Sequence, residues 1–306
     1  MTSLFAHRLL LVVGKGGVGR TTVATALARA ATQTGRRVLL AQTNHPERLG
    51  RLLSSSSPIG PNITGVDERL WAVNMTPKAA LHEYGVSLLK YEPLYRAVFE
   101  NKPMRSFLGA FPGLDYWTML GKTWWHTTET FEGKPKYDLV VLDAPASGHA
   151  VAMLRIPDAV ASAMPKGPLA RDALLTRALL SDSQRTAAVI VTLPEELPAR
   201  ETVTLARDLR ALRIPLGPLV VNAMPPPEAA DPGVARMIEA AAGRTVPAEF
   251  AGVLAGTSIL AQRREDADRI VEGLANDPGL PMIHLPRLPT SNLGPEEIAN
   301  LASLLA

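Results

Sequence analysis

The chain has 306 residues, of which 46% are hydrophobic and 20% are charged, with a formal net charge of +3. This is enough apolar material for one large α/β domain or two small ones, and no block of like charges indicates a nucleic-acid arm. There is no cysteine, which excludes disulfides, thiolate metal sites, iron–sulfur clusters and cysteine nucleophiles.

Short apolar runs rich in β-formers alternate with helical patterns along the chain. They predict strands at residues 9–13, 38–42, 70–73, 139–142, 188–192, 219–222 and 282–285. The helical patterns lie at residues 21–34, 77–90, 171–180, 201–211, 266–275 and 295–305. This alternation predicts one α/β domain over residues 1–306, a doubly wound and mostly parallel sheet with helices on both faces. The longest purely apolar run, residues 9–13, is far shorter than the roughly 18 residues of a membrane-spanning helix, so we expect a cytoplasmic protein.

One region departs from this alternation. Eleven of the fifteen aromatic residues lie between Tyr84 and Phe131, interrupted by Pro93, Pro103 and Pro112. We interpret residues 75–135, approximately, as an inserted helical subdomain. Its aromatic residues form either the subdomain's own small core or an apolar surface for a client.

A glycine-rich stretch connects the first strand to the first helix. It contains Gly14, Lys15, Gly16, Gly17, Val18, Gly19, Arg20, Thr21 and Thr22. Glycines at such a turn let backbone N–H groups point at a polyphosphate, and the positive end of the helix adds attraction for the anion. Thr21 would place its hydroxyl on Mg²⁺. The alternative is a turn that merely joins strand to helix, but the pattern and its flanks favour a phosphate-binding loop.

Polar residues follow the second and fourth predicted strands. Open α/β sheets bind ligands beyond the carboxyl ends of their strands. Asp143 directly follows residues 139–142 and could hold Mg²⁺ directly or through water, or could serve as a helix cap. Gly148 and His149 are expected to form a mobile segment that senses a γ-phosphate, although His149 taken alone could be an ordinary loop histidine.

These segments resemble a known family. Lys15-Gly16-Gly17-Val18-Gly19-x-Thr21-Thr22 resembles the deviant Walker A motif of the ArsA, MinD, ParA and nitrogenase-iron-protein superfamily of P-loop NTPases. The segment 143–149 is similar to the Asp-Thr-Ala-Pro-Thr-Gly-His switch of arsenite-pump and tail-anchored-protein-targeting (guided-entry) ATPases. Val220-Val221-Asn222 resembles the strand end that contacts adenine in that family.

The resemblance implies an ATPase that binds ATP or ADP with Mg²⁺. It also implies a dimer, a homodimer or a heterodimer with a related ATPase subunit, in which Lys15 reaches into the neighbour's active site. A solvated charge is the alternative for Lys15. By the same resemblance, Asn222 contacts the base, and the insert at 84–131 would engage a membrane-protein client or transporter.

Two positions depart from the family's pattern. Arg20 replaces the loop lysine that contacts the β- and γ-phosphates, and a planar guanidinium cannot occupy the space of an ammonium group. Asn44 replaces the aspartate that positions and deprotonates the attacking water, and losing a general base costs on the order of 10² to 10⁴ in rate. The catalytic positions Lys15, Arg20, Asn44 and Asp143 therefore predict weak or partner-dependent ATP hydrolysis.

The missing cysteines also limit the resemblance, because neither an arsenite thiolate site nor a zinc clamp can form. Two alternative functions stay open. One is a pseudo-ATPase subunit that scaffolds a heterodimer. The other is a Min/Par-type spatial regulator, whose membrane form needs a basic amphipathic C-terminal helix, whereas residues 294–301 carry two acids and no base. No nucleic-acid partner is expected.

Overall fold

A parallel sheet forms the centre of the molecule. The computed structural model describes residues 4–43, 49–89, 113–164, 166–231, 248–290 and 292–306, with isolated positions 93, 101, 233, 236 and 240. The strand order is β10-β9-β8-β1-β7-β2-β4-β3. Seven strands are parallel: β1 (Leu9–Gly14), β2 (Val38–Thr43), β4 (Leu70–Met75), β7 (Leu139–Asp143), β8 (Thr186–Thr192), β9 (Leu216–Met224) and β10 (Met282–Pro286). The short β3 (Thr64–Gly65) is antiparallel at the edge. All seven predicted strands and the predicted fold class are confirmed.

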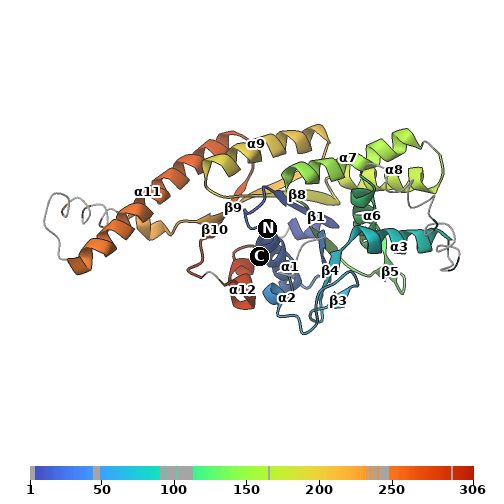
Figure 1. The fold of residues 1–306 in the computed structure, drawn as a ribbon, viewed down its shortest axis with the longest axis horizontal. Coiled ribbons are helices and arrows are strands. Elements are labelled where there is room, and N and C mark those ends of the chain that lie inside the picture. The colour runs from blue at the N-terminus through green and yellow to red at the C-terminus, as the bar shows by residue number, and fades with distance from the viewer. Residues whose placement is uncertain are drawn as a thin grey trace.

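Helices cover both faces of this sheet (Figure 1). One face carries α1 (Arg20–Gln33), α2 (Leu49–Leu53) and α12 (Pro295–Ser303). The other carries α3 (Pro77–Leu89), α6 (Leu114–Thr128), α7 (Ser147–Ala163), α8 (Pro168–Ser181), α9 (Glu196–Ala211) and α11 (Ala248–Asn276). Short 3-10 turns lie at Leu4–Ala6 and Pro227–Ala230, and β5 (Thr130–Phe131) pairs with β6 (Lys134–Pro135) as a small hairpin. None of the helices described has a sufficiently long apolar stretch to span a bilayer.

Side-chain alternation along β1 divides the core into two layers. Leu9, Leu11 and Val13 pack on the face of α6 to α9, whereas Leu10 and Val12 pack on the face of α1 and α12. All six β1 residues are buried, because helices cover both faces and successive side chains point to opposite sides. The continuous apolar run that predicted this strand therefore reflects a position at the centre of the sheet.

Two helices differ from the predictions. We expected Gly148 and His149 in a mobile segment, but α7 begins at Ser147, so both residues lie in its first turn. The helix predicted at 266–275 is the last part of α11, whose first half extends away from the sheet (Figure 1).

Part of the aromatic region contributes to the core. Trp117 packs in a small buried cluster with Val160 and Ala173, and Tyr116 and Trp124 pack against the larger core layer. The side chains of Trp125 and Phe131 are exposed. Most of residues 90–112, where the rest of the expected client surface would be, lie outside the described residues.

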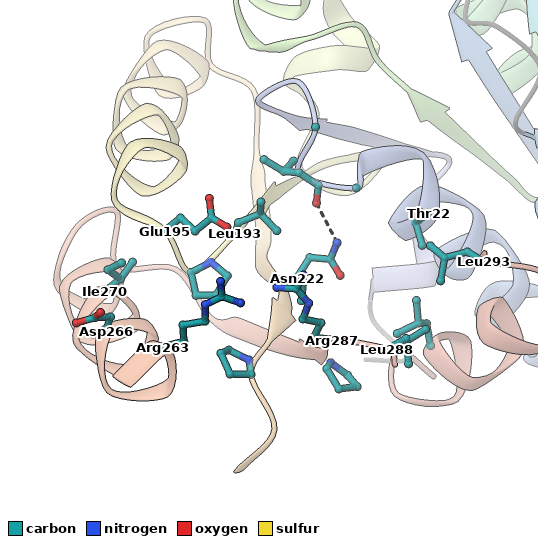
Figure 2. Close-up of a pocket in the computed structure, with 18 of the residues that line it drawn as sticks. Thr22, Leu193, Glu195, Asn222, Arg263, Asp266, Ile270, Arg287, Leu288 and Leu293 are labelled. Atoms are coloured by element: carbon teal, nitrogen blue, oxygen red, sulfur yellow. Dashed lines mark hydrogen bonds between the residues drawn. The ribbon is translucent and has the colours of Figure 1, made fainter. Parts of the chain in front are cut away.

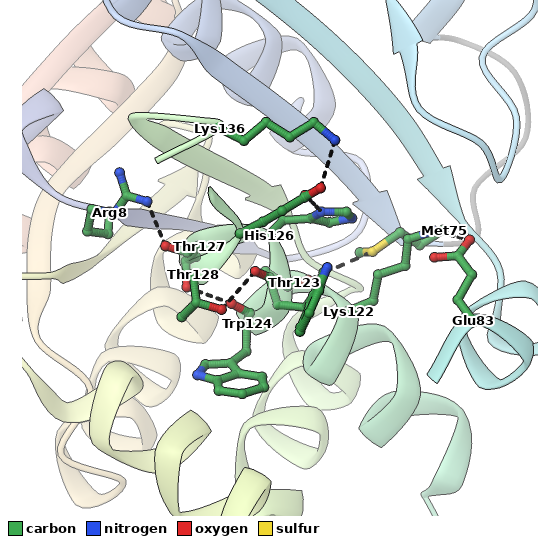
Figure 3. A network of polar contacts seen from close by, with 12 residues as sticks. Arg8, Met75, Glu83, Lys122, Thr123, Trp124, His126, Thr127, Thr128 and Lys136 are labelled. Atoms are coloured by element: carbon green, nitrogen blue, oxygen red, sulfur yellow. Dashed lines mark hydrogen bonds and ion pairs between the residues drawn. The ribbon is translucent and has the colours of Figure 1, made fainter. Parts of the chain in front are cut away.

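Polar contacts attach α6 to the body of the protein (Figure 3). The buried Lys122 donates to Glu83 at 2.7 Å and to the Pro61 carbonyl at 3.1 Å, while Arg8 donates to the Thr127 carbonyl at 2.6 Å. Glu129 follows α6, and its carboxylate is bonded by His126, in the last turn of α6, at 3.1 Å and by Lys136 at 2.7 Å. These hydrogen bonds lower the pKa of Glu129 from 4.5 to about 2. The C-terminal end of α6 is therefore held by ionic contacts as well as by packing.

Candidate functional site

The predicted phosphate loop lies between β1 and α1, at the carboxyl edge of the sheet. A Cβ at Gly14 would stand 2.3 Å from the Val191 carbonyl of β8, so only glycine fits where the loop leaves the strand. Gly19 is the N-cap of α1 in a left-handed conformation, with φ 89°, and no side chain caps the helix. The first N–H groups of α1 are therefore available to an anion.

The outer side of this loop is open. Nothing lies within 4 Å of where a Cβ would stand at Gly16 or Gly17. A turn that is open at Gly16 and Gly17 and leads into a helix N-terminus without a side-chain cap has the form and the electrostatics of a polyphosphate cradle. The loop therefore fits the phosphates of a nucleotide.

Asp143 lies at the end of β7, next to the first turn of α1. Its side chain is 5% exposed. Thr21 donates its hydroxyl proton to Asp143 Oδ2 at 2.7 Å, and Gln42 of β2 donates Nε2–H to the same oxygen at 3.2 Å. Thr43 donates to the backbone carbonyl of Asp143 at 3.1 Å. The two residues predicted to hold Mg²⁺ are thus in contact, and hydroxyl and carboxylate oxygens are ligands that Mg²⁺ takes.

Arg20 points toward the segment that follows β7. Its guanidinium donates to the Ala144 carbonyl at 2.5 Å. Burial lowers the pKa of Arg20, and the nearby Asp143 charge opposes that shift. One donor of Arg20 is therefore committed to backbone rather than to the open side of the loop. Asn44, the other departure from the family pattern, lies outside the described residues.

Lys15 makes an ion pair within the chain. Its Nζ is 2.9 Å from Glu201 Oε1 on α9, and both side chains are partly exposed. Exposed pairs of this kind contribute about 0–1 kcal/mol. Further along the sheet edge, His149 shares a hydrogen bond of 2.6 Å with the hydroxyl of Tyr116 on α6.

A cavity of about 1340 Å³ adjoins the phosphate loop (Figure 2). Asn222, at the end of β9, lies in its wall and donates Nδ2–H to the Val18 carbonyl of the loop at 2.9 Å. Loop residues Gly17, Val18, Gly19 and Thr22 form one side. Most of the remaining wall comes from the ends of β8, β9 and β10 and from α11, and includes Leu193, Glu195, Arg263, Asp266, Ile270, Arg287 and Leu288. Mixed apolar and polar walls beside a phosphate cradle suit a nucleoside.

Sequence reasoning missed several of these wall residues. Arg287 and Leu288 follow β10, so the rule that ligands bind beyond strand ends could have found them. Arg263 comes from the middle of α11, and no local pattern marks it. The structure brings together the loop, Thr21, Asp143 and Asn222 from among the predicted residues.

A strand, an open glycine loop and a helix, with a strand-end aspartate touching the helix threonine, define a P-loop NTPase. The sequence profile of a family described as anion-transporting ATPase matches residues 7–174. The chain therefore belongs to the anion-transporting (ArsA) ATPase family, whose members bind nucleotide.

Individual relatives agree with this assignment. ATPase BagA of Mycobacterium tuberculosis (strain ATCC 25618 / H37Rv) is 30% identical over 273 residues, which cover 82% of this chain and 78% of that protein. The arsenical pump-driving ATPase of Escherichia coli is 26% identical over 281 residues, 82% of this chain but 46% of its own length. The ATPase ASNA1 homolog of Trypanosoma cruzi is 27% identical over 271 residues, 70% of this chain and 73% of that protein.

Proposed function

We propose that this chain is a cytoplasmic subunit of a nucleotide-dependent ATPase dimer that couples ATP binding and hydrolysis to a membrane-protein client or transporter. The observation that carries the proposal is the 2.7 Å contact between Thr21 and Asp143 beside an open glycine loop. Hydroxyl and carboxylate at this position are what a P-loop ATPase requires next to the phosphates.

The residues divide the work as follows. Backbone N–H groups of residues 14–22 bind the phosphates, and the cavity beside Asn222 takes the base and ribose. Thr21 and Asp143 would hold Mg²⁺, which supplies positive charge to neutralise the phosphates. Asn222 also fixes the loop, because it bonds the Val18 carbonyl.

We propose that the nucleotide site of the isolated chain hydrolyses ATP only weakly. Arg20 commits a donor to the Ala144 carbonyl, and its forked guanidinium cannot replace a lysine ammonium on the phosphates. Lys15 lies near the surface in a partly exposed ion pair, and breaking it costs little free energy. We propose that Lys15 completes the nucleotide site of a partner subunit, either a second copy or a related ATPase.

Calorimetric titration of the isolated chain with ATP, in the presence and absence of Mg²⁺, tests this function. We expect one ATP per chain, with an affinity that rises when Mg²⁺ is present and loses that dependence in Asp143→Asn. Arg207→Ala, an exposed change on α9, is the matched control and should bind like the wild type. Absence of ATP binding at millimolar nucleotide would contradict the proposal and favour the scaffold subunit instead.

A further inference from the structure

A buried glutamine lies beside Asp143. Gln42 is at the end of β2, and in the parallel pairing of β2 with β7 it stands opposite Asp143. Its side chain is 1% exposed, and its Nε2 donates to Asp143 Oδ2 at 3.2 Å. The same carboxylate oxygen accepts the proton of Thr21. Gln42 is therefore part of the polar cluster at the foot of the phosphate loop.

The orientation of this amide is fixed by its neighbour. An ionised carboxylate accepts hydrogen bonds and cannot donate one, so the amide nitrogen, not the oxygen, must face Asp143. Gln42 Oε1 is then left as an acceptor in the same planar group, close to Asp143. It is buried and has no hydrogen-bond partner among the described residues. A buried acceptor without a donor is destabilising, and a native site normally supplies one.

The chemistry of the cluster indicates which donor this is. Thr21 and Asp143 offer the hydroxyl and carboxylate oxygens that bind Mg²⁺, and Mg²⁺ in proteins keeps several of its waters. Metal-bound waters are strong hydrogen-bond donors, and acceptors that do not touch the metal orient these waters and tune the metal's affinity. An amide can hold the carboxylate in place through its N–H donor and orient a metal-bound water through its carbonyl oxygen.

We propose that Gln42 is a positioning residue for a divalent cation, holding Asp143 through Nε2 and accepting a hydrogen bond from the cation's water shell through Oε1. This inference rests on the proposed Mg²⁺-nucleotide site. It concerns how tightly the cation is held, and the first effect of changing Gln42 is on the Mg²⁺ concentration that nucleotide binding requires.

The test is the affinity of a fluorescent ATP analogue measured across a Mg²⁺ titration, with a parallel measurement in EDTA. Gln42→Leu should raise the Mg²⁺ concentration at half-effect about tenfold and leave the affinity in EDTA close to that of wild type. Gln42→Glu keeps an acceptor oxygen but loses the Nε2–H donor to Asp143, so it should raise that concentration by less than Gln42→Leu does. Arg207→Ala, the exposed change on α9, is again the control and should behave as wild type.

The outcomes separate this inference from the function beneath it. If wild-type binding does not depend on Mg²⁺, the metal part of the proposed function fails and this inference falls with it. If wild type depends on Mg²⁺ but both Gln42 variants match it, the inference alone is wrong. If Gln42→Leu and Gln42→Glu raise the required Mg²⁺ concentration equally and both lower the Tm, Gln42 acts only in packing, and the inference is again wrong.

Discussion

Gly19 is the residue at which the loop conformation can be tested most quantitatively. It adopts φ 89° and ψ 25° at the N-cap of α1. A Cβ added there would lie 2.3 Å from Asn222 Nδ2. Gly19→Ala therefore imposes two penalties, one on the backbone and one on the contact between the loop and β9.

The two penalties have different sizes. A left-handed conformation costs a residue with a Cβ about 1–2 kcal/mol. Asn222 must also move away, which removes its hydrogen bond to Val18, worth about 0.5–1.5 kcal/mol. We therefore expect Gly19→Ala to lower the free energy of unfolding by about 1.5–3.5 kcal/mol and to weaken ATP binding.

A double-mutant cycle with Asn222→Ala isolates the second penalty. Denaturant unfolding of wild type, both single variants and the double variant supplies the four free energies. Once Asn222 is truncated, Gly19→Ala should cost only the backbone part, so the double variant is less destabilised than the sum of the singles. Strictly additive costs would refute the reasoning, because the clash with Asn222 would then contribute nothing.

Two further predictions concern charged groups. Lys15→Ala should leave ATP binding to the chain within about twofold of wild type, because breaking a partly exposed ion pair costs about 1 kcal/mol or less. The same variant should reduce ATP turnover when a related subunit with lysine at the Arg20 position is added. Unchanged turnover of the mixture would argue against a role of Lys15 in the partner's site. The lowered pKa of Glu129 adds stability above about pH 4.5 that is lost as pH falls toward 2. Glu129→Gln should therefore lower the free energy of unfolding by about 1–2 kcal/mol at pH 7 and make it depend less on pH between 4.5 and 2. The same pH dependence of the free energy of unfolding in wild type and variant would contradict this assignment.

The sheet could be predicted because central parallel strands are buried on both faces. Residues 9–13 and 139–142 are uninterrupted apolar runs, and the structure places them side by side. The phosphate loop was equally predictable, since its glycine spacing can be read directly from the sequence. The glycines at Gly14 and Gly19 are required by positive φ angles and by the distant residues Val191 and Asn222, but the pattern itself is local.

The parts that were missed depend on tertiary context. α7 begins one residue before Gly148 and continues through Pro157, and both residue types normally indicate a break. Its buried face against the sheet, including Met153 and Leu154, outweighs those local costs. The pairing of Gln42 with Asp143 joins residues 101 positions apart, and Arg263 reaches the cavity wall from α11. No local pattern specifies such contacts.

The central claim is that this chain carries an ATP site weakened by Arg20 and Asn44. ATP turnover of the isolated protein, compared between wild type and the double variant Arg20→Lys with Asn44→Asp, tests it most directly. A restored ammonium and general base should raise turnover at saturating Mg²⁺-ATP by about tenfold or more. Equal turnover in the two proteins, with ATP bound in both, would contradict the claim that these two residues limit the chemistry.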